Sequence, residues 1–304
     1  MKRIVILAFI TGLLFSLFLW LRPKIGSRGT PTLPKVAGRP SKPVADGTAG
    51  GVVTNTPAAS TVGPAVPRPG PAAAAQAGVT HADEIEQEIL NLVNEVRARA
   101  QRKPLQPDNT LQTTARSHCD DMFLRGYFAH EDPDGVSPAD RISEAHRQLI
   151  GVTGENIWMG TNIDLSDQKK TAASIMNDWM QSARHRDGIL NEKYTHIGIG
   201  VALKGHDVKA TQNFATIVAL TRQAVPLQVH GGDGLDLAAQ PLDGNYAPDS
   251  FEFFSPEEGM AVGGPRPIAG ASVPDRTIVP AGTYRLRFLF PEQKAYWGPQ
   301  VEVK

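Results

Sequence analysis

The feature that most limits the fold of this 304-residue chain is the segment of residues 22–80, which is rich in Pro, Ala, Gly and Thr and contains no aromatic residue. Such a segment buries too little apolar surface to offset the entropy lost on ordering. We therefore predict a disordered linker over residues 22–80, partly extended by its prolines. It carries seven Lys and Arg residues and one acid. This positive charge could hold the segment near anionic lipid or cell-wall polymer. The alternative is that the segment is a tether whose charge only keeps it soluble.

The N-terminus carries an uncharged apolar run, residues 4–21, behind Lys2 and Arg3. At 1.5 Å per residue such a run spans about 27 Å, which is close to the thickness of one bilayer core. The run ends in Trp20–Leu21–Arg22–Pro23 and has no A-x-A cleavage pattern. Residues 1–21 are therefore predicted to be a membrane anchor, with a cleaved signal segment as the alternative. We expect the folded part to be extracytoplasmic, anchored to the membrane or secreted.

The charge of the folded part argues against one class of partner. Residues 81–304 carry 22 Lys and Arg residues against 30 Asp and Glu residues. Nucleic-acid binding needs a basic face, so no nucleic-acid partner is expected. The single cysteine, Cys119, excludes an intramolecular disulfide, and its place on an apolar helical stripe predicts a packed thiol. Stability must come from burial or from a bound metal.

Helical patterns precede strand patterns in residues 81–225. Helices are expected to begin near residues 80, 108, 137 and 166, the first with Thr80 and Asp83 as a capping box, and strands are expected at residues 196–203 and 211–220. This order predicts an α+β domain with a small antiparallel sheet.

The composition changes after Val225, where Pro and Gly punctuate short strand-like runs. In residues 283–290, Tyr284 and Leu286 alternate with Arg285 and Arg287, which is the period of a half-buried strand. Residues 226–304 are therefore predicted to be a small all-β, sandwich-like module. We find no chemical motif in it.

Three polar side chains are candidates for a functional site. The standard motifs of zinc proteases, serine hydrolases and phosphate-binding loops are absent. His130 is predicted at the end of the second helix, Glu155 in a glycine turn within "TGENIW", and His185 within "SARHRDGIL". Each also has a structural interpretation, as a core histidine or a cap of backbone amides. His118 is interpreted as structural.

Taken in order, the segments "YFAH", "GEN", "HR…IL", "THIGIGVA" and "QNF" resemble the cysteine-rich secretory protein, antigen 5 and pathogenesis-related 1 (CAP) superfamily. They are most similar to its disulfide-free bacterial branch, the SCP-like domains. The resemblance covers about residues 82–221. It implies an α-β-α sandwich with a small antiparallel sheet, and a cleft built around two histidines and acidic residues. The second glutamate of eukaryotic members is missing, because Gln181 and Ser182 stand where an acid is expected.

By position, the resemblance assigns His130, Glu155 and His185 to that cleft. The imidazoles of His130 and His185 can bind a divalent metal, most plausibly zinc, with water in the open positions. Glu155 can hold such a water, orient a histidine or act as a catalytic base. Two protein ligands make a weak site, since catalytic zinc usually has three.

Three functions remain open at this point. The first is an extracytoplasmic binding module for a lipid, glycan or peptide, which the missing glutamate and the lack of a nucleophile favour. The second is a metal-assisted hydrolase of peptide or cell-wall bonds, with Glu155 as its base. The third is surface adhesion or a structural role carried by residues 226–304.

Overall fold

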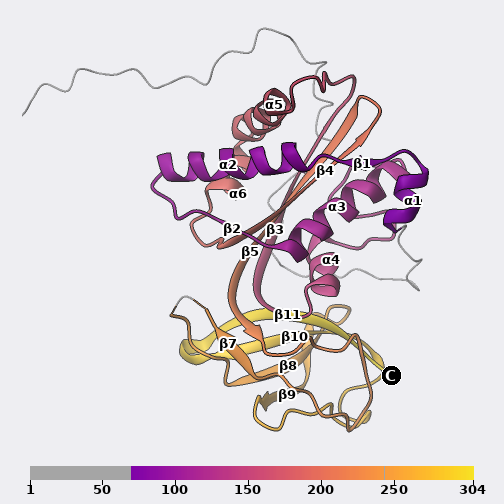
Figure 1. Ribbon diagram of the computed structural model, residues 1–304. Helices are drawn as coiled ribbons and strands as arrows, with labels where there is room; N and C mark the ends of the chain where they lie inside the picture. The colour runs from indigo at the N-terminus through magenta and orange to yellow at the C-terminus, as the bar shows by residue number, and fades with distance from the viewer. Residues whose placement is uncertain (1–69, 243) are drawn as a thin grey trace, which may run out of the picture. The chain divides into compact units, whose positions relative to one another are not determined.

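The computed structural model describes residues 70–242 and 244–304 (Figure 1). The predicted anchor at residues 4–21 and the predicted linker as far as residue 69 lie outside the described residues. Within the described ranges, no helix is both long and apolar enough to span a bilayer.

Six α-helices occur in the described residues. They are α1 (Pro71–Gln76), α2 (Asp83–Arg99), α3 (Asn109–Leu124), α4 (Pro138–Ala145), α5 (Gln168–Gln181) and α6 (Ala183–Leu190). Asp108 caps α3 by accepting from the N–H of Leu111, and Ser137 forms a reciprocal capping box with Asp140 on α4. These caps confirm the predicted starts of α3 and α4, because a short oxygen-bearing side chain satisfies the free N–H groups of a first turn. The predicted capping box at Thr80 is wrong, since Thr80 lies in a strand and α2 begins at Asp83 after the N-cap Ala82.

The strands form one hydrogen-bonded sheet whose main path runs β1-β4-β5-β3-β11-β10-β8-β9. They are β1 (Thr80–His81), β2 (Gln106–Pro107), β3 (Leu149–Gly160), β4 (His196–Lys204), β5 (Asp207–Thr221), β6 (Gln228–Val229), β7 (Ala239–Pro241), β8 (Ser250–Ser255), β9 (Met260–Pro267), β10 (Gly282–Phe290) and β11 (Lys294–Val303). The central pairs, β3 with β5 and β4 with β5, are antiparallel. The predicted α+β class with an antiparallel sheet is confirmed.

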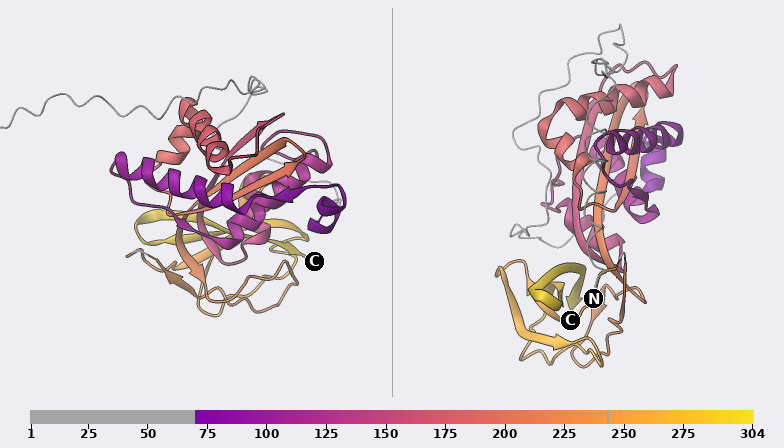
Figure 2. Two further views of the ribbon diagram at one scale, coloured as in Figure 1. Left: turned by 45° about the horizontal axis from the view of Figure 1, so that its top comes forward. Right: turned by 90° about the vertical axis from the view of Figure 1, so that its left-hand side faces the viewer.

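Helices cover both faces of β3, β4 and β5 (Figure 2). On one face α3 lies so close to β4 that a Cβ on Gly200 would be 2.3 Å from the backbone nitrogen of Arg116. On the other face Trp179 of α5 donates its indole N–H to the carbonyl oxygen of Ile157, at 3.1 Å. Side chains of β3 alternate between these two faces, which decides where each site residue points.

Strand β3 corrects the prediction that "TGENIW" forms a glycine turn. Gly154 lies within the strand and pairs with Phe214 of β5. A Cβ on Gly151 would lie 1.9 Å from the carbonyl oxygen of Thr216. Glycine therefore permits close approach of two backbones here, which is the other role that glycine has in a strand.

Helix α1 and strand β1 correct the end of the predicted linker. Pro71 stands in the first turn of α1, where its missing N–H costs nothing, and an alanine run follows it. Ala74 and Val79 are buried against Cys119 and Met122 of α3. This burial stabilises a helix too short to persist alone, so the predicted disorder is wrong for residues 71–80.

Residues 226–304 are β-rich as predicted, but their strands are not a separate sandwich. β11 pairs with β3, and β7 pairs with β5. The apolar core around β8 and β10 includes Ile150 of β3 and Val218 of β5. At 12 and 15 residues, β3 and β5 are long enough to contribute to both cores. The prediction of an adhesive role for this region stays a prediction.

Candidate functional site

His130 lies in a loop after α3 and not at the helix end, which corrects its predicted position. Gly126 and Gly135, at φ 71° and 80°, allow the loop to turn where other residues would be strained. Asp132 accepts hydrogen bonds of 2.9 Å from the backbone N–H groups of Asp134 and Val136. The acids that follow His130 therefore shape the turn, as expected for an Asx-type contact.

Glu155 is fully buried on β3, and its carboxylate joins two segments to the sheet. Its Oε1 lies 2.9 Å from His130 Nδ1. Its Oε2 accepts a hydrogen bond of 2.8 Å from Nη2 of Arg141, which lies on α4. The other arm of Arg141 donates from Nη1 to the carbonyl oxygens of His130, at 2.8 Å, and Val136, at 3.0 Å. The structure thus brings together the predicted pair His130 and Glu155, and adds Arg141.

A third histidine, His118 of α3, borders the same carboxylate and was not predicted as a site residue. Its Nε2 lies 3.8 Å from Glu155 Oε1 and 3.1 Å from the carbonyl oxygen of Ala129, to which it donates. The helical spacing of Leu111, Ala115 and His118 places all three on the buried stripe of α3. That periodicity was the available signal that His118 faces the sheet.

The charges of this cluster follow from burial and from Arg141. Burial alone would raise the pKa of Glu155, but Arg141, His118 and His130 outweigh it and hold that pKa at about 2. Burial lowers the pKa of His118 to about 3, and the nearby Arg141 adds to that effect. His118 is therefore neutral at neutral pH, so Arg141 supplies the charge that keeps Glu155 ionised.

This arrangement decides which group can do chemistry. A carboxylate with a pKa of about 2 is a poor general base near pH 7, and the catalytic role of Glu155 stays a prediction. Its bond to Nδ1 instead fixes the orientation of the His130 ring. Nε2 of His130 is buried and has no hydrogen-bond partner among the described residues. Nε of Arg141 is buried and unpaired in the same way, so the cluster holds two polar nitrogens without a partner among the described residues.

His185 lies on α6, and the structure relates it to β3 through a different residue. Asn156, which follows Glu155, donates from Nδ2 to the carbonyl oxygen of His185, at 3.1 Å. Neighbouring side chains of a strand point to opposite faces, so the Asn156 amide and the Glu155 carboxylate lie on different sides of β3. Convergence of the His185 ring with His130 stays a prediction, as does a cleft lined by all three residues.

Among the described residues, the donors around His130 are fewer than a three-ligand zinc site needs. A carboxylate on the far nitrogen of a histidine is a common support for metal ligation, and the bond between Glu155 and His130 has this form. However, residues 70–242 and 244–304 contain no group of three or more His, Cys, Asp or Glu side chains placed to hold an ion. One suitable nitrogen falls short of the three ligands of a catalytic site. Metal binding by His130 and His185 stays a prediction.

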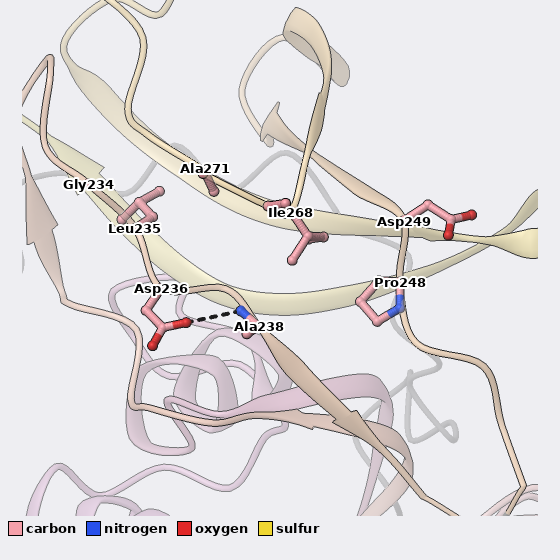
Figure 3. Close-up of a pocket in the computed structure, with 10 residues that line it drawn as sticks. Gly234, Leu235, Asp236, Ala238, Pro248, Asp249, Ile268 and Ala271 are labelled. Atoms are coloured by element: carbon pink, nitrogen blue, oxygen red, sulfur yellow. Dashed lines mark hydrogen bonds between the residues drawn. The ribbon is translucent and has the colours of Figure 1, made fainter.

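A pocket of about 770 Å³ lies in the C-terminal region and contains none of the predicted site residues. Figure 3 shows its lining, where Asp236 accepts a hydrogen bond from the backbone N–H of Ala238. The lining is mainly apolar, with Leu235, Ile268 and Ala271 among its residues. It lacks the convergent polar groups that mark a specific binding site.

Residues 90–216 match the family model of the cysteine-rich secretory protein (CAP) family. The matched segment includes His130, Glu155 and His185 and ends before β6. The chain therefore contains a segment that matches the CAP family, as the resemblance of its motifs predicts.

Two curated relatives come from Bacillus subtilis (strain 168). The uncharacterized protein YkwD is 36% identical over 120 residues, which cover 40% of this chain and 43% of YkwD. The uncharacterized membrane protein YlbC is 33% identical over 129 residues, which cover 42% of this chain and 34% of YlbC. The chain therefore spans less than half the length of either relative.

Solved structures with some similarity include an extracellular SCP-domain protein from Bacillus anthracis str. Ames. It is 28% identical, with a TM-score of 0.37, and the match covers 50% of this chain and 45% of that protein. A structure of NaASP2 with Zn²⁺ is 14% identical, with a TM-score of 0.33, and the match covers 45% of this chain and 81% of that protein. The zinc ion is a feature of that structure.

Proposed function

We propose that this protein is an extracytoplasmic binding protein whose CAP segment uses His130 to hold a lipid, glycan or peptide. The observation that carries the proposal is the state of the His130 ring. Glu155 holds Nδ1 at 2.9 Å, while the buried Nε2 has no partner among the described residues. An unpaired buried nitrogen costs free energy, about 1–3 kcal/mol, which a hydrogen-bonding ligand would recover.

Two further observations favour binding over covalent catalysis. Cys119 is fully buried, and burial raises the pKa of its thiol to about 12, so no thiolate nucleophile is available. Glu155 is ionised but enclosed, with each oxygen already bonded to His130 or Arg141. The cluster is thus arranged to keep one imidazole in place.

The location outside the cytoplasm rests on the apolar run at residues 4–21. One similar protein from Bacillus subtilis is a membrane protein by name, which supports it. Protease treatment of intact cells should remove the CAP segment while cytoplasmic markers survive. Protection of the segment until the cells are lysed would contradict this location.

The binding proposal is tested on the full-length chain with three probes. These are anionic phospholipid vesicles, soluble peptidoglycan fragments and a mixture of short peptides, each titrated by calorimetry. His130→Gln should weaken the binding of one probe at least about tenfold, since a buried polar contact is worth about 1.4 kcal/mol or more. His206→Gln is the matched control, because the His206 ring is exposed and hydrogen-bonds to the carbonyl oxygen of Ile163. Binding that is unchanged in His130→Gln, or no binding of any probe by the wild type, would overturn the proposal.

A hydrolase remains the second candidate, and one observation favours it. If the bond to Glu155 keeps the proton of a neutral His130 on Nδ1, Nε2 has a free lone pair and can accept a proton from an attacking water. The base is then His130 and not Glu155. Turnover of labelled peptides or peptidoglycan that is lost in His130→Gln and kept in His206→Gln would favour this candidate. Lack of turnover by the wild type with both substrates would rule it out.

A further inference from the structure

The helix α4 lies between the His130 cluster and the C-terminal strands. Its Arg141 is 4% exposed and bonds Glu155 on one side. On the other side the structure places β11, which lies next to α4 in Figure 1. A helix of eight residues does not hold its own position in water, so its neighbours must determine where Arg141 sits.

Arg285 of β10 contacts α4 through its side chain. Its Nη2 donates to the carbonyl oxygen of Ala139, and its Nη1 lies 4.0 Å from Asp140 Oδ1. Both partners belong to the first turn of α4, directly before Arg141. A second contact supports the same helix, because Ser143 Oγ accepts a hydrogen bond of 2.7 Å from the backbone N–H of Gln300.

The alternation of β10 explains why an arginine occupies this place. Tyr284 and Leu286 belong to the apolar core, so Arg285 between them points to the opposite face, toward α4. Arg285 is only 3% exposed, and its Nε has no hydrogen-bond partner among the described residues. A buried cation with an incomplete set of partners is a poor source of stability. Its specific contacts with one helical turn suggest a role in placing that turn.

We propose that Arg285 is a positioning residue for the His130 site and acts through α4 and Arg141. The connection runs from Arg285 to the first turn of α4, then from Arg141 to Glu155 and the carbonyl oxygen of His130. Residues 226–304 lie beyond the matched family segment. They complete the site without contributing a group that touches a ligand.

This inference rests on the proposed function only in taking His130 as the ligand-binding residue. Its test measures the environment of the His130 ring and does not depend on a ligand. Side-chain ¹H–¹⁵N spectra of the histidines report the environment of the His130 ring, and amide hydrogen exchange reports the opening of α4. Arg285→Met in the full-length chain should shift the His130 signals. Exchange of the amides of α4 and residues 130–136 should become about tenfold faster, the effect expected when a charged hydrogen bond is lost.

Arg287→Met is the matched control. Arg287 faces the same side of the same strand, but its ion pair is with Glu252 of β8 and not with α4. It should leave the His130 signals and the exchange of α4 unchanged. Arg285→Lys keeps the cation, so it should shift the His130 signals less than Arg285→Met does. If only the packing of the side chain mattered, and not its charge, this difference would not be expected.

Three outcomes decide the proposal. A His130 shift in Arg285→Met that is absent in Arg287→Met and smaller in Arg285→Lys supports it. Unchanged His130 signals in a folded Arg285→Met overturn it, whatever the ligand experiments give. If Arg285→Met does not fold, the same histidine spectra are recorded for Ser143→Ala instead. That variant removes the bond from Gln300 and should shift the same signals by a smaller amount, whereas identical spectra would overturn the proposal.

Discussion

Arg141 Nη2 and Glu155 Oε2 form a hydrogen bond of 2.8 Å at the centre of the site, with 4% and 0% of their side chains exposed. The pair is what allows a charged carboxylate to persist under His130. Burying a charge without a partner is costly, and removing one member of a buried pair leaves the other uncompensated.

Arg141→Met should therefore lower the free energy of unfolding by about 3–5 kcal/mol, because Glu155 loses its cation. The double variant Arg141→Met/Glu155→Gln should recover part of that loss. Arg102→Met is the control, since its ion pair with Glu192 at 2.7 Å is exposed, and such pairs contribute about 0–1 kcal/mol. Urea denaturation measures all three. Equal losses in Arg141→Met and Arg102→Met would contradict a central role for the buried pair.

The low pKa of His118 predicts a loss of stability in mild acid. In the unfolded chain a histidine has a pKa of about 6.5, whereas His118 in the folded state has a pKa of about 3. The unfolded state therefore binds more protons between these values. Stability is complete above pH 6.5 and falls by about 1.4 kcal/mol per pH unit below it.

His118→Gln should flatten this pH dependence between pH 6.5 and 4.5, because glutamine does not titrate. Below that window Glu155 adds a loss of the same sign, since its folded pKa of about 2 lies under the unfolded value of about 4.3. His230→Gln is the control, as His230 is 66% exposed. Unfolding free energies from urea titrations at pH 7.0, 6.0 and 5.0 give the slopes. A slope in His118→Gln equal to that of the wild type would show that another group titrates.

The order of motifs along the sequence predicted that His130 and Glu155 would meet, because each lies at a recognisable position in a known family. The local cause of that meeting was not predictable in the same way. Gly154 suggested a turn, and only its pairing with Phe214 of β5 shows that it lies within a strand. Propensity describes one residue with its neighbours in the chain, whereas close packing depends on a partner strand.

The sequence could not identify Arg141 and Arg285 as site residues for a similar reason. Arg141 lies in an ordinary amphipathic helix, and its buried partner is 14 residues away in sequence. Arg285 showed only the polar phase of an alternating strand. The contact with Ala139 spans 146 residues, and no local pattern encodes it. Capping residues such as Asp108 and Ser137 were predictable because their partners lie within the next turn.

Gly200 tests the packing that holds His118 and Cys119 against the sheet. A Cβ at this position would lie 2.3 Å from Arg116 N and 2.5 Å from the carbonyl carbon of Ala115. Gly200→Ala should therefore push α3 from β4 and lower stability by about 3 kcal/mol. Gly234→Ala is the control, because no atom lies within 4 Å of its added Cβ. Thermal unfolding followed by circular dichroism measures both. A melting temperature for Gly200→Ala within 1 °C or so of the control would contradict this contact.

The reactivity of the Cys119 thiol measures the same contact between α3 and the sheet. It is fully buried, with Sγ 3.2 Å from Thr211 Oγ1 and 3.4 Å from the carbonyl oxygen of Gly200. Burial raises its pKa to about 12, so a disulfide reagent at pH 8 can react only when α3 separates from the sheet. We expect labelling of the native chain to be at least ~1000-fold slower than labelling in guanidinium, since the rate then follows the opening equilibrium. Gly200→Ala should accelerate it, and Gly234→Ala should not. Rapid labelling of the native wild type would mean that this face of the sheet opens without unfolding.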